Sequence, residues 1–117
     1  MRISGITIEG SKEARNMGFK TANIRTDLNI DTGIYKGKTE LEGETFLSAI
    51  YVGNYRPGIL ETHLIGFSGN DFYGKNILVD IEEKIRDDRS DLSEEDLKKL
   101  IAEDIKKICD LADKKNV

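Results

Sequence analysis

The chain has 117 residues, which is enough for one domain but too few for two independent hydrophobic cores. Its 18 basic and 22 acidic residues give a net charge of -4, the opposite sign to that of a general nucleic-acid binder. A single cysteine and a single histidine, Cys109 and His63, exclude an internal disulfide and a zinc site built on such ligands. Because no long apolar run is present, we expect no membrane span and no signal peptide. The single cysteine indicates a reducing, cytoplasmic environment.

The first 85 residues predict a series of short strands. Eleven glycines against one proline indicate turns built mainly with glycine, as in β-rich folds. Glu42-Gly43 has the length of a two-residue hairpin turn between two β-prone runs. The expected strands are a first one around residues 3–8 and further ones at residues 22–25, 33–41, 44–52, 61–67 and 76–85.

The last of these strands shows the clearest alternation. Ile77, Val79 and Ile81 are spaced by two residues, which predicts one buried face. Glu83 interrupts the apolar pattern on that face, and Ile85 resumes it. We therefore expect a regular strand whose buried face is interrupted by one polar residue.

The C-terminal part predicts a long amphipathic helix over residues 93–114. Ser93 and Asp96 have the spacing of a capping box, in which the serine hydroxyl accepts a hydrogen bond from the backbone three residues on. Short strands followed by one terminal helix predict a mainly β fold, a small antiparallel barrel with the helix packed on it. The apolar stripe of the helix consists of Leu97, Leu100, Ile101, Ile105, Ile108 and Ala112, with lysines on the other side.

Two segments imitate known ligand-binding loops. Residues 18–21 end like a phosphate-binding P-loop, but Phe19 separates the glycine from Lys20 and the earlier glycine is missing. Residues 27–31 imitate a calcium loop, but the glycine comes one residue late and the twelfth position is Lys38. We expect neither loop type.

Five short motifs in order along the chain are more informative. They are RNMGFKTANI at residues 15–24, GIY at 33–35, Gly53 followed by Pro57, ETH at 61–63 and DFYG at 71–74. Together they resemble the ATP-dependent riboflavin kinase (flavokinase) family, whose signature is a Gly-Arg pair and then Leu-Gly-Phe-Pro-Thr-Ala-Asn. The resemblance runs from about Gly5 to Leu111. Lys20 in place of that proline, and a short stretch before Glu61, mark a divergent member.

The resemblance implies a small antiparallel Greek-key-like barrel and transfer of the ATP γ-phosphate to the 5′-hydroxyl of riboflavin, which gives FMN and ADP. Mg²⁺ would be the cofactor, and riboflavin/FMN and ATP/ADP the partners. The chain leaves no room for an adenylyltransferase domain. We therefore expect one stand-alone kinase domain over residues 1–117, monomeric, with neither nucleic acid nor membrane as a partner.

The resemblance also implies roles for individual residues. Glu61 would be the catalytic base, and Thr21 and Asn23 would hold Mg²⁺ beside the phosphates, since a hard cation prefers oxygen ligands. Tyr73, Arg86, Leu92 and Leu97 would contact the flavin. The nucleotide-binding residues would be Gly10, Arg15, Gly18, Lys20, Thr21 and Asn23.

Each of these residues also has a purely structural interpretation. Thr21 and Asn23 have side chains that are common in turns, and Arg86 could form a surface salt bridge. Glu61 lies in an apolar context, and His63 shares its face of a strand, where packing explains a histidine at least as well as catalysis. The alternative function is a catalytically degenerate module that binds a flavin or a nucleotide. A small nucleic-acid-binding barrel is disfavoured by the acidic net charge and the absence of tryptophan.

Overall fold

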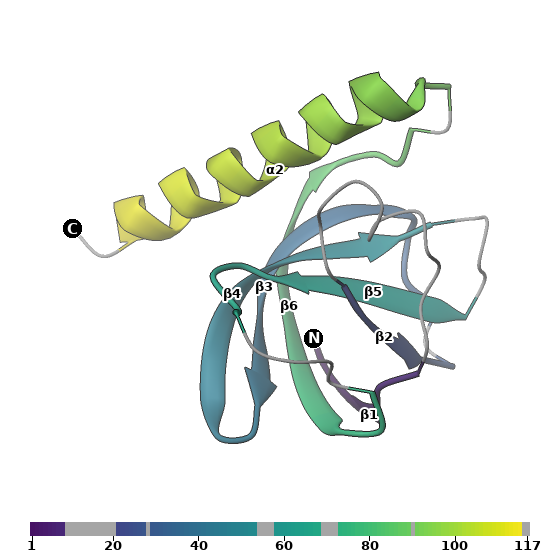
Figure 1. The fold of residues 1–117 in the computed structure, drawn as a ribbon, viewed down its shortest axis with the longest axis vertical. Helices are drawn as coiled ribbons and strands as arrows, with labels where there is room; N and C mark the ends of the chain where they lie inside the picture. The colour runs from purple at the N-terminus through teal and green to yellow at the C-terminus, as the bar shows by residue number, and fades with distance from the viewer. Residues whose placement is uncertain (9–20, 28, 54–57, 69–72, 90, 116–117) are drawn as a thin grey trace.

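The structure is a computed structural model that describes residues 1–8, 21–27, 29–53, 58–68, 73–89 and 91–115. In this part of the chain, six strands form one antiparallel sheet, and a single helix crosses its outside (Figure 1). The elements are β1 (Arg2–Ile6), β2 (Ala22–Arg25), β3 (Gly33–Leu41), β4 (Glu44–Val52), β5 (Ile59–Leu64), β6 (Asn76–Arg86) and α2 (Glu94–Lys115).

The sheet curls into a nearly closed barrel. Its strand order is β1-β6-β3-β4-β5-β2, so β3 to β6 lie in the order β6-β3-β4-β5, which is the Greek-key arrangement. The two edges meet beyond the end of β1, where the Ile8 amide donates to the carbonyl oxygen of Asn23 at 2.7 Å. The predicted fold class, a mainly β barrel with one C-terminal helix, is confirmed.

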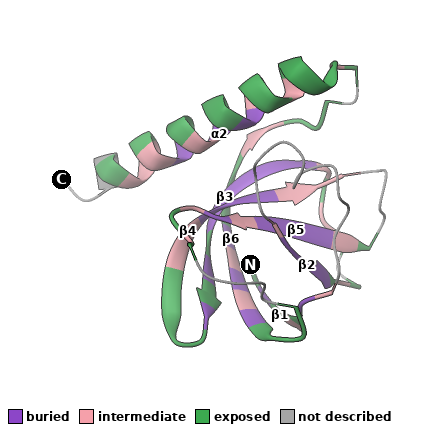
Figure 2. Ribbon diagram, in the orientation of Figure 1, coloured by how far each residue is buried: buried purple, intermediate pink, exposed green. Residues whose placement is uncertain are grey.

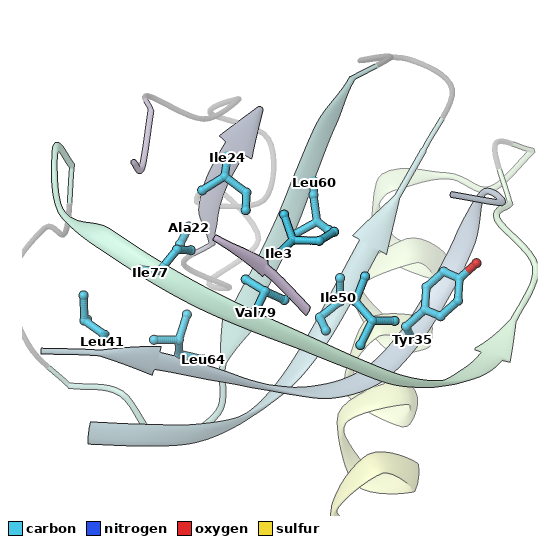
Figure 3. Packing of buried hydrophobic residues seen from close by; sticks show 11 residues of the cluster. Ile3, Ala22, Ile24, Tyr35, Leu41, Ile50, Leu60, Leu64, Ile77 and Val79 are labelled. Carbon is cyan, nitrogen blue, oxygen red and sulfur yellow. The ribbon is translucent and has the colours of Figure 1, made fainter. Parts of the chain in front are cut away.

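Alternate side chains of the strands fill the barrel interior. Ile24, Ile50, Leu60 and Val79 are fully buried and point toward one another there (Figure 3). The hydroxyls inside the barrel satisfy one another, because Ser48 donates to Thr39 at 2.9 Å and Thr39 lies 2.8 Å from Thr62. Side chains of the strands thus fill the interior, and we expect a ligand site on the outer surface or at a rim.

The boundaries of β2, β3 and β4 are those that the sequence predicts, and so is the Glu42-Gly43 turn, where both residues have positive φ. The prediction for β5 is wrong at both ends. This strand runs from Ile59 to Leu64 instead of over residues 61–67, because pairing with β2 extends it backward and a turn at Ile65-Gly66 ends it. The positive φ of 85° at Gly66 favours glycine at that turn.

β6 is less regular than its alternation suggests. Ile77, Val79 and Ile81 are buried as predicted, but the register against β3 shifts after Ile81 and again before Arg86. Each shift inserts an unpaired residue, so the face expected to continue through Glu83 and Ile85 does not. Opposite the first shift lies Gly37, where a Cβ atom would stand 2.2 Å from the carbonyl oxygen of Asp80. The close approach of two backbones therefore requires glycine.

α2 starts and packs as predicted. The Ser93 hydroxyl accepts a hydrogen bond from the Asp96 amide at 3.2 Å, which is the first half of the expected capping box. Ile101 and Ile108 are the buried members of the apolar stripe, on a helix that contacts β4 (Figure 2). Within the described residues, no helix has the length and apolarity needed to cross a lipid bilayer.

Candidate functional site

One line of side chains crosses the outer face of the barrel. Residues directly opposite each other on antiparallel strands point to the same face, with Cβ atoms about 5 Å apart. The neighbours Leu60 and Ile50 belong to the interior, so Glu61 and Tyr51 point outward. Strand pairing from β6 through β3, β4 and β5 to β2 then aligns five residues, which we call the cross-strand row: Arg86, Ile34, Tyr51, Glu61 and Asn23.

Glu61 lies in the second half of this row. Its side chain is buried, with 8% of the residue exposed, between Tyr51 on β4 and Asn23 on β2. Leu60 and Thr62, its neighbours along β5, are inaccessible to solvent but belong to the barrel interior, so they point away from the Glu61 side chain. A carboxylate kept from water in this way is unusual, because such groups are normally exposed unless they are paired or used.

Asn23 lies beside Glu61 with an unsatisfied oxygen. Its amide nitrogen donates to the carbonyl oxygen of Thr21 at 3.3 Å, which fixes the side chain. Its Oδ1 atom is buried and has no hydrogen-bond partner among the described residues. Burying such an acceptor costs about 1–3 kcal/mol, so it calls for an explanation. Thr21 is half-buried and directly precedes β2, so the structure brings these two predicted ligands together next to Glu61.

Tyr51, on the other side of Glu61, was not identified from the sequence. Its hydroxyl is the second buried polar atom for which the described part of the chain provides no hydrogen-bond partner. Burial raises the pKa of Tyr51, the negative charge of Asp104 raises it further, and Arg86 opposes this effect only in part. The hydroxyl is therefore a neutral donor at every physiological pH. No local pattern marks Tyr51, because its position beside Glu61 follows from strand pairing alone.

Arg86 ends the row at β6 and is engaged by the helix. Its Nε and Nη2 atoms donate to the two carboxylate oxygens of Asp104 at 2.9 and 2.7 Å, and Nη1 donates to the Asp87 carbonyl oxygen at 3.0 Å. The Asp104 side chain is only 4% exposed. The arginine predicted to contact the flavin is thus held in a buried, bidentate ion pair, and the surface salt bridge considered as an alternative is not what the structure shows.

The remaining predicted flavin contacts lie in two places. Leu92 and Leu97 are half-buried at the start of α2, shortly after Arg86 along the chain. Tyr73 is exposed and precedes β6, whereas Arg86 ends it. With 11 residues in β6, the strand separates these two residues by roughly 30 Å. Arg86 pairs with Asp104 in the middle of α2, about two helical turns beyond Leu97, so the structure does not bring the four predicted flavin contacts to one place.

The structure provides less information on the remaining candidate residues. Gly10, Arg15, Gly18 and Lys20 lie outside the described residues. His63 is half-buried, shares the outward face of β5 with Glu61 and pairs with Ala49. Cys109 is a half-buried free thiol on α2. No group of three or more His, Cys, Asp or Glu side chains forms a metal cluster within the described ranges.

Comparison with known sequences assigns the chain to a family. The family model for riboflavin kinase (Flavokinase) matches residues 1–112. A bifunctional riboflavin kinase/FMN adenylyltransferase from Haemophilus influenzae is 39% identical over 113 residues, and its counterpart from Escherichia coli K12 is 33% identical over 110 residues. The matches cover 89% and 87% of this chain but only 36% and 35% of those relatives, so the chain spans about a third of their length.

Solved structures share the fold. Riboflavin kinase from Trypanosoma brucei superposes with a TM-score of 0.71 at 23% identity, covering 97% of this chain and 80% of that one. A macrolide-efflux protein from Streptococcus pneumoniae gives a TM-score of 0.75 at 22% identity, over 90% of this chain and 37% of that one. At such identities these likenesses concern the fold, whereas the family model and the bacterial relatives concern the sequence itself. On that evidence, the chain belongs to the riboflavin kinase (flavokinase) family.

Proposed function

We propose that this chain acts as one riboflavin kinase domain, which transfers the γ-phosphate of ATP to the 5′-hydroxyl of riboflavin and releases FMN and ADP. Family membership supports the reaction class. The observation that carries the proposal is the position of Glu61, a buried carboxylate between the two unsatisfied polar atoms Asn23 Oδ1 and the Tyr51 hydroxyl. A buried acid flanked by unsatisfied groups is what a site prepared for a polar ligand requires.

Thr21 and Asn23 form the nucleotide side of this site. Their side-chain oxygens are hard donors, and the unpaired Oδ1 of Asn23 fits a cation such as Mg²⁺, for which these two residues are the proposed ligands. When bound, Mg²⁺ neutralises the charge of the ATP phosphates. The backbone around Gly10 and Gly18, with Arg15 and Lys20, completes the proposed nucleotide contacts.

Glu61 performs the proton transfer in this proposal. The 5′-hydroxyl oxygen of riboflavin forms a bond to the γ-phosphorus while the bond from that phosphorus to the bridging β–γ oxygen breaks. The hydroxyl proton passes to the Glu61 carboxylate, and ADP leaves with the bridging oxygen. Burial of Glu61 suits this role, because neighbouring water does not compete for its oxygens.

The flavin side is proposed at the start of α2. Leu92 and Leu97 offer half-buried apolar surface there. An isoalloxazine ring binds by apolar contact and stacking, which such surface supplies. Tyr73 takes part only if the chain around it approaches α2, because β6 separates the two regions.

A single assay tests the proposal. The protein is incubated with riboflavin, ATP and MgCl₂, and the flavins are separated by chromatography. Conversion of riboflavin to FMN is the expected result. Riboflavin or ATP binding without FMN formation would instead identify a degenerate binding module.

A further inference from the structure

The Tyr51 hydroxyl is a polar group without an assigned use at the centre of the cross-strand row. Register places Tyr51 directly opposite Glu61 on one side and Ile34 on the other. Its hydroxyl is inaccessible to water and has no hydrogen-bond partner among the residues that the structure describes. A phenylalanine would fill the same space without burying an unpaired hydroxyl.

The nearest charged groups do not provide the Tyr51 hydroxyl with a hydrogen-bond acceptor. Asp104 and Glu61 both lie close enough for their charges to act on Tyr51, but neither accepts a hydrogen bond from its hydroxyl, and the two carboxylate oxygens of Asp104 already accept from Arg86. Arg86 has no acceptor to offer, because a guanidinium only donates. Tyr35 provides a contrast within the same chain, since its hydroxyl donates to the Asp31 carbonyl oxygen at 2.6 Å.

We propose that the Tyr51 hydroxyl donates a hydrogen bond to the polyol chain of the alcohol substrate, at a hydroxyl next to the one that Glu61 deprotonates. This inference rests on the proposed kinase function. Asn23 occupies the nucleotide side of Glu61, so Tyr51, on the opposite side, faces the other substrate. Adjacent carbons of a polyol each carry a hydroxyl, so a chain that offers one hydroxyl to Glu61 can present the next to the residue paired with Glu61 on the neighbouring strand.

The chemistry of the group suits this role. The raised pKa of Tyr51 keeps its hydroxyl protonated, so the hydroxyl is always available as a hydrogen-bond donor. The hydroxyl is shielded from solvent, so the substrate displaces a neighbouring side chain to reach it. The resulting hydrogen bond then forms where water does not compete, and an analogue without the polyol leaves the hydroxyl unpaired. Tyr51 would thus select flavins by their side chain and not by their ring.

Tyr51→Phe tests the inference, with Tyr35→Phe as a matched control that removes a satisfied hydroxyl. The affinities for riboflavin and for lumiflavin, which has the same ring but no polyol, are measured by fluorescence titration. Tyr51→Phe should weaken riboflavin binding about 3- to 10-fold, the size of one neutral hydrogen bond, and leave lumiflavin binding unchanged. It should also raise Tm, because a buried unpaired group is removed, whereas Tyr35→Phe should lower Tm and preserve the ratio of the two affinities.

Two outcomes would overturn the inference while the kinase function stands. One is a higher Tm with unchanged riboflavin affinity, which would show that the hydroxyl contacts no substrate. The other is an equal loss of riboflavin and lumiflavin affinity, which would place the effect on the ring. The proposed kinase function is tested separately: it is wrong if the wild-type protein makes no FMN. If the wild-type protein also does not bind riboflavin, both proposals are wrong.

Discussion

Arg86, the last residue of β6, donates two hydrogen bonds to the carboxylate of Asp104 in the middle of α2, at 2.9 and 2.7 Å. The pair joins the barrel to the helix next to Tyr51, and the Asp104 side chain is almost fully buried. A buried carboxylate is tolerated only while its partner remains. The position of α2, and with it the proposed flavin contacts of Leu92 and Leu97, therefore depends on this pair.

Arg86→Met should destabilise the protein strongly. The change leaves the Asp104 carboxylate buried without its cation, and breaking such a pair from one side typically costs about 3–5 kcal/mol. The free energy of unfolding in urea measures this loss. The double variant Arg86→Met/Asp104→Leu should recover most of it, because both charges are then absent.

Arg89→Met is the matched control for Arg86→Met. Arg89 forms a comparable ion pair with Asp91 at 3.0 Å, but both side chains are exposed. Its loss should shift the unfolding midpoint far less. Equal shifts for Arg86→Met and Arg89→Met would show that burial of the Arg86–Asp104 pair does not determine its importance.

Glu61→Gln should abolish most of the turnover without abolishing binding. Glutamine keeps the size and shape of the side chain but cannot accept the hydroxyl proton, and general-base help is typically worth about 10²- to 10⁴-fold. We expect kcat for FMN formation to fall within this range, with riboflavin and ATP still bound. Glu40→Gln, at an exposed position of β3, should leave kcat unchanged. Intact kcat with weaker binding in Glu61→Gln would make Glu61 a substrate anchor instead.

Thr21→Ala should weaken binding of ATP in the presence of Mg²⁺ and reduce turnover together. The variant removes the hydroxyl of the residue whose backbone carbonyl oxygen accepts a hydrogen bond from the Asn23 amide, on the proposed nucleotide side. Calorimetric titration with MgATP measures the affinity, and Thr45→Ala, at an exposed position of β4, serves as the control. Unchanged MgATP affinity and normal kinetics in Thr21→Ala would remove Thr21 from the site. Chelation of divalent ions should stop FMN formation in the wild-type protein.

Tyr51 should make the folded state lose stability in alkaline solution. Its pKa is raised in the folded protein by burial and by the charge of Asp104, whereas the unfolded chain releases the proton near pH 10. Below about pH 10 the Tyr51 hydroxyl is protonated in both states, so its titration does not change the free energy of unfolding. Above this pH only the unfolded chain releases the proton, and the free energy of unfolding falls. Urea unfolding between pH 8 and 11 should show the wild type losing about 1.4 kcal/mol per pH unit more than Tyr51→Phe above pH 10. Parallel curves for the two proteins would contradict the raised pKa.

The local elements follow from the sequence alone. Two β-prone runs on either side of the Glu42-Gly43 turn predicted β3 and β4, and the apolar stripe behind Ser93 predicted α2. These features depend on neighbours within a few residues, so the pattern of side chains specifies them. The ordered motifs also predicted the family, because each of them is a short contiguous stretch.

The neighbours of Glu61, in contrast, follow from the three-dimensional fold. The ends of β5 follow from pairing with β2, and the irregular register of β6 follows from the close approach of its backbone to Gly37. The same strand pairing places Tyr51 opposite Glu61 and brings Arg86 within reach of Asp104. Register between strands is set by contacts among residues far apart in the chain, and a shift of one residue would reverse every side chain. Local pattern can therefore identify Glu61 as a candidate, but the fold alone supplies its neighbours.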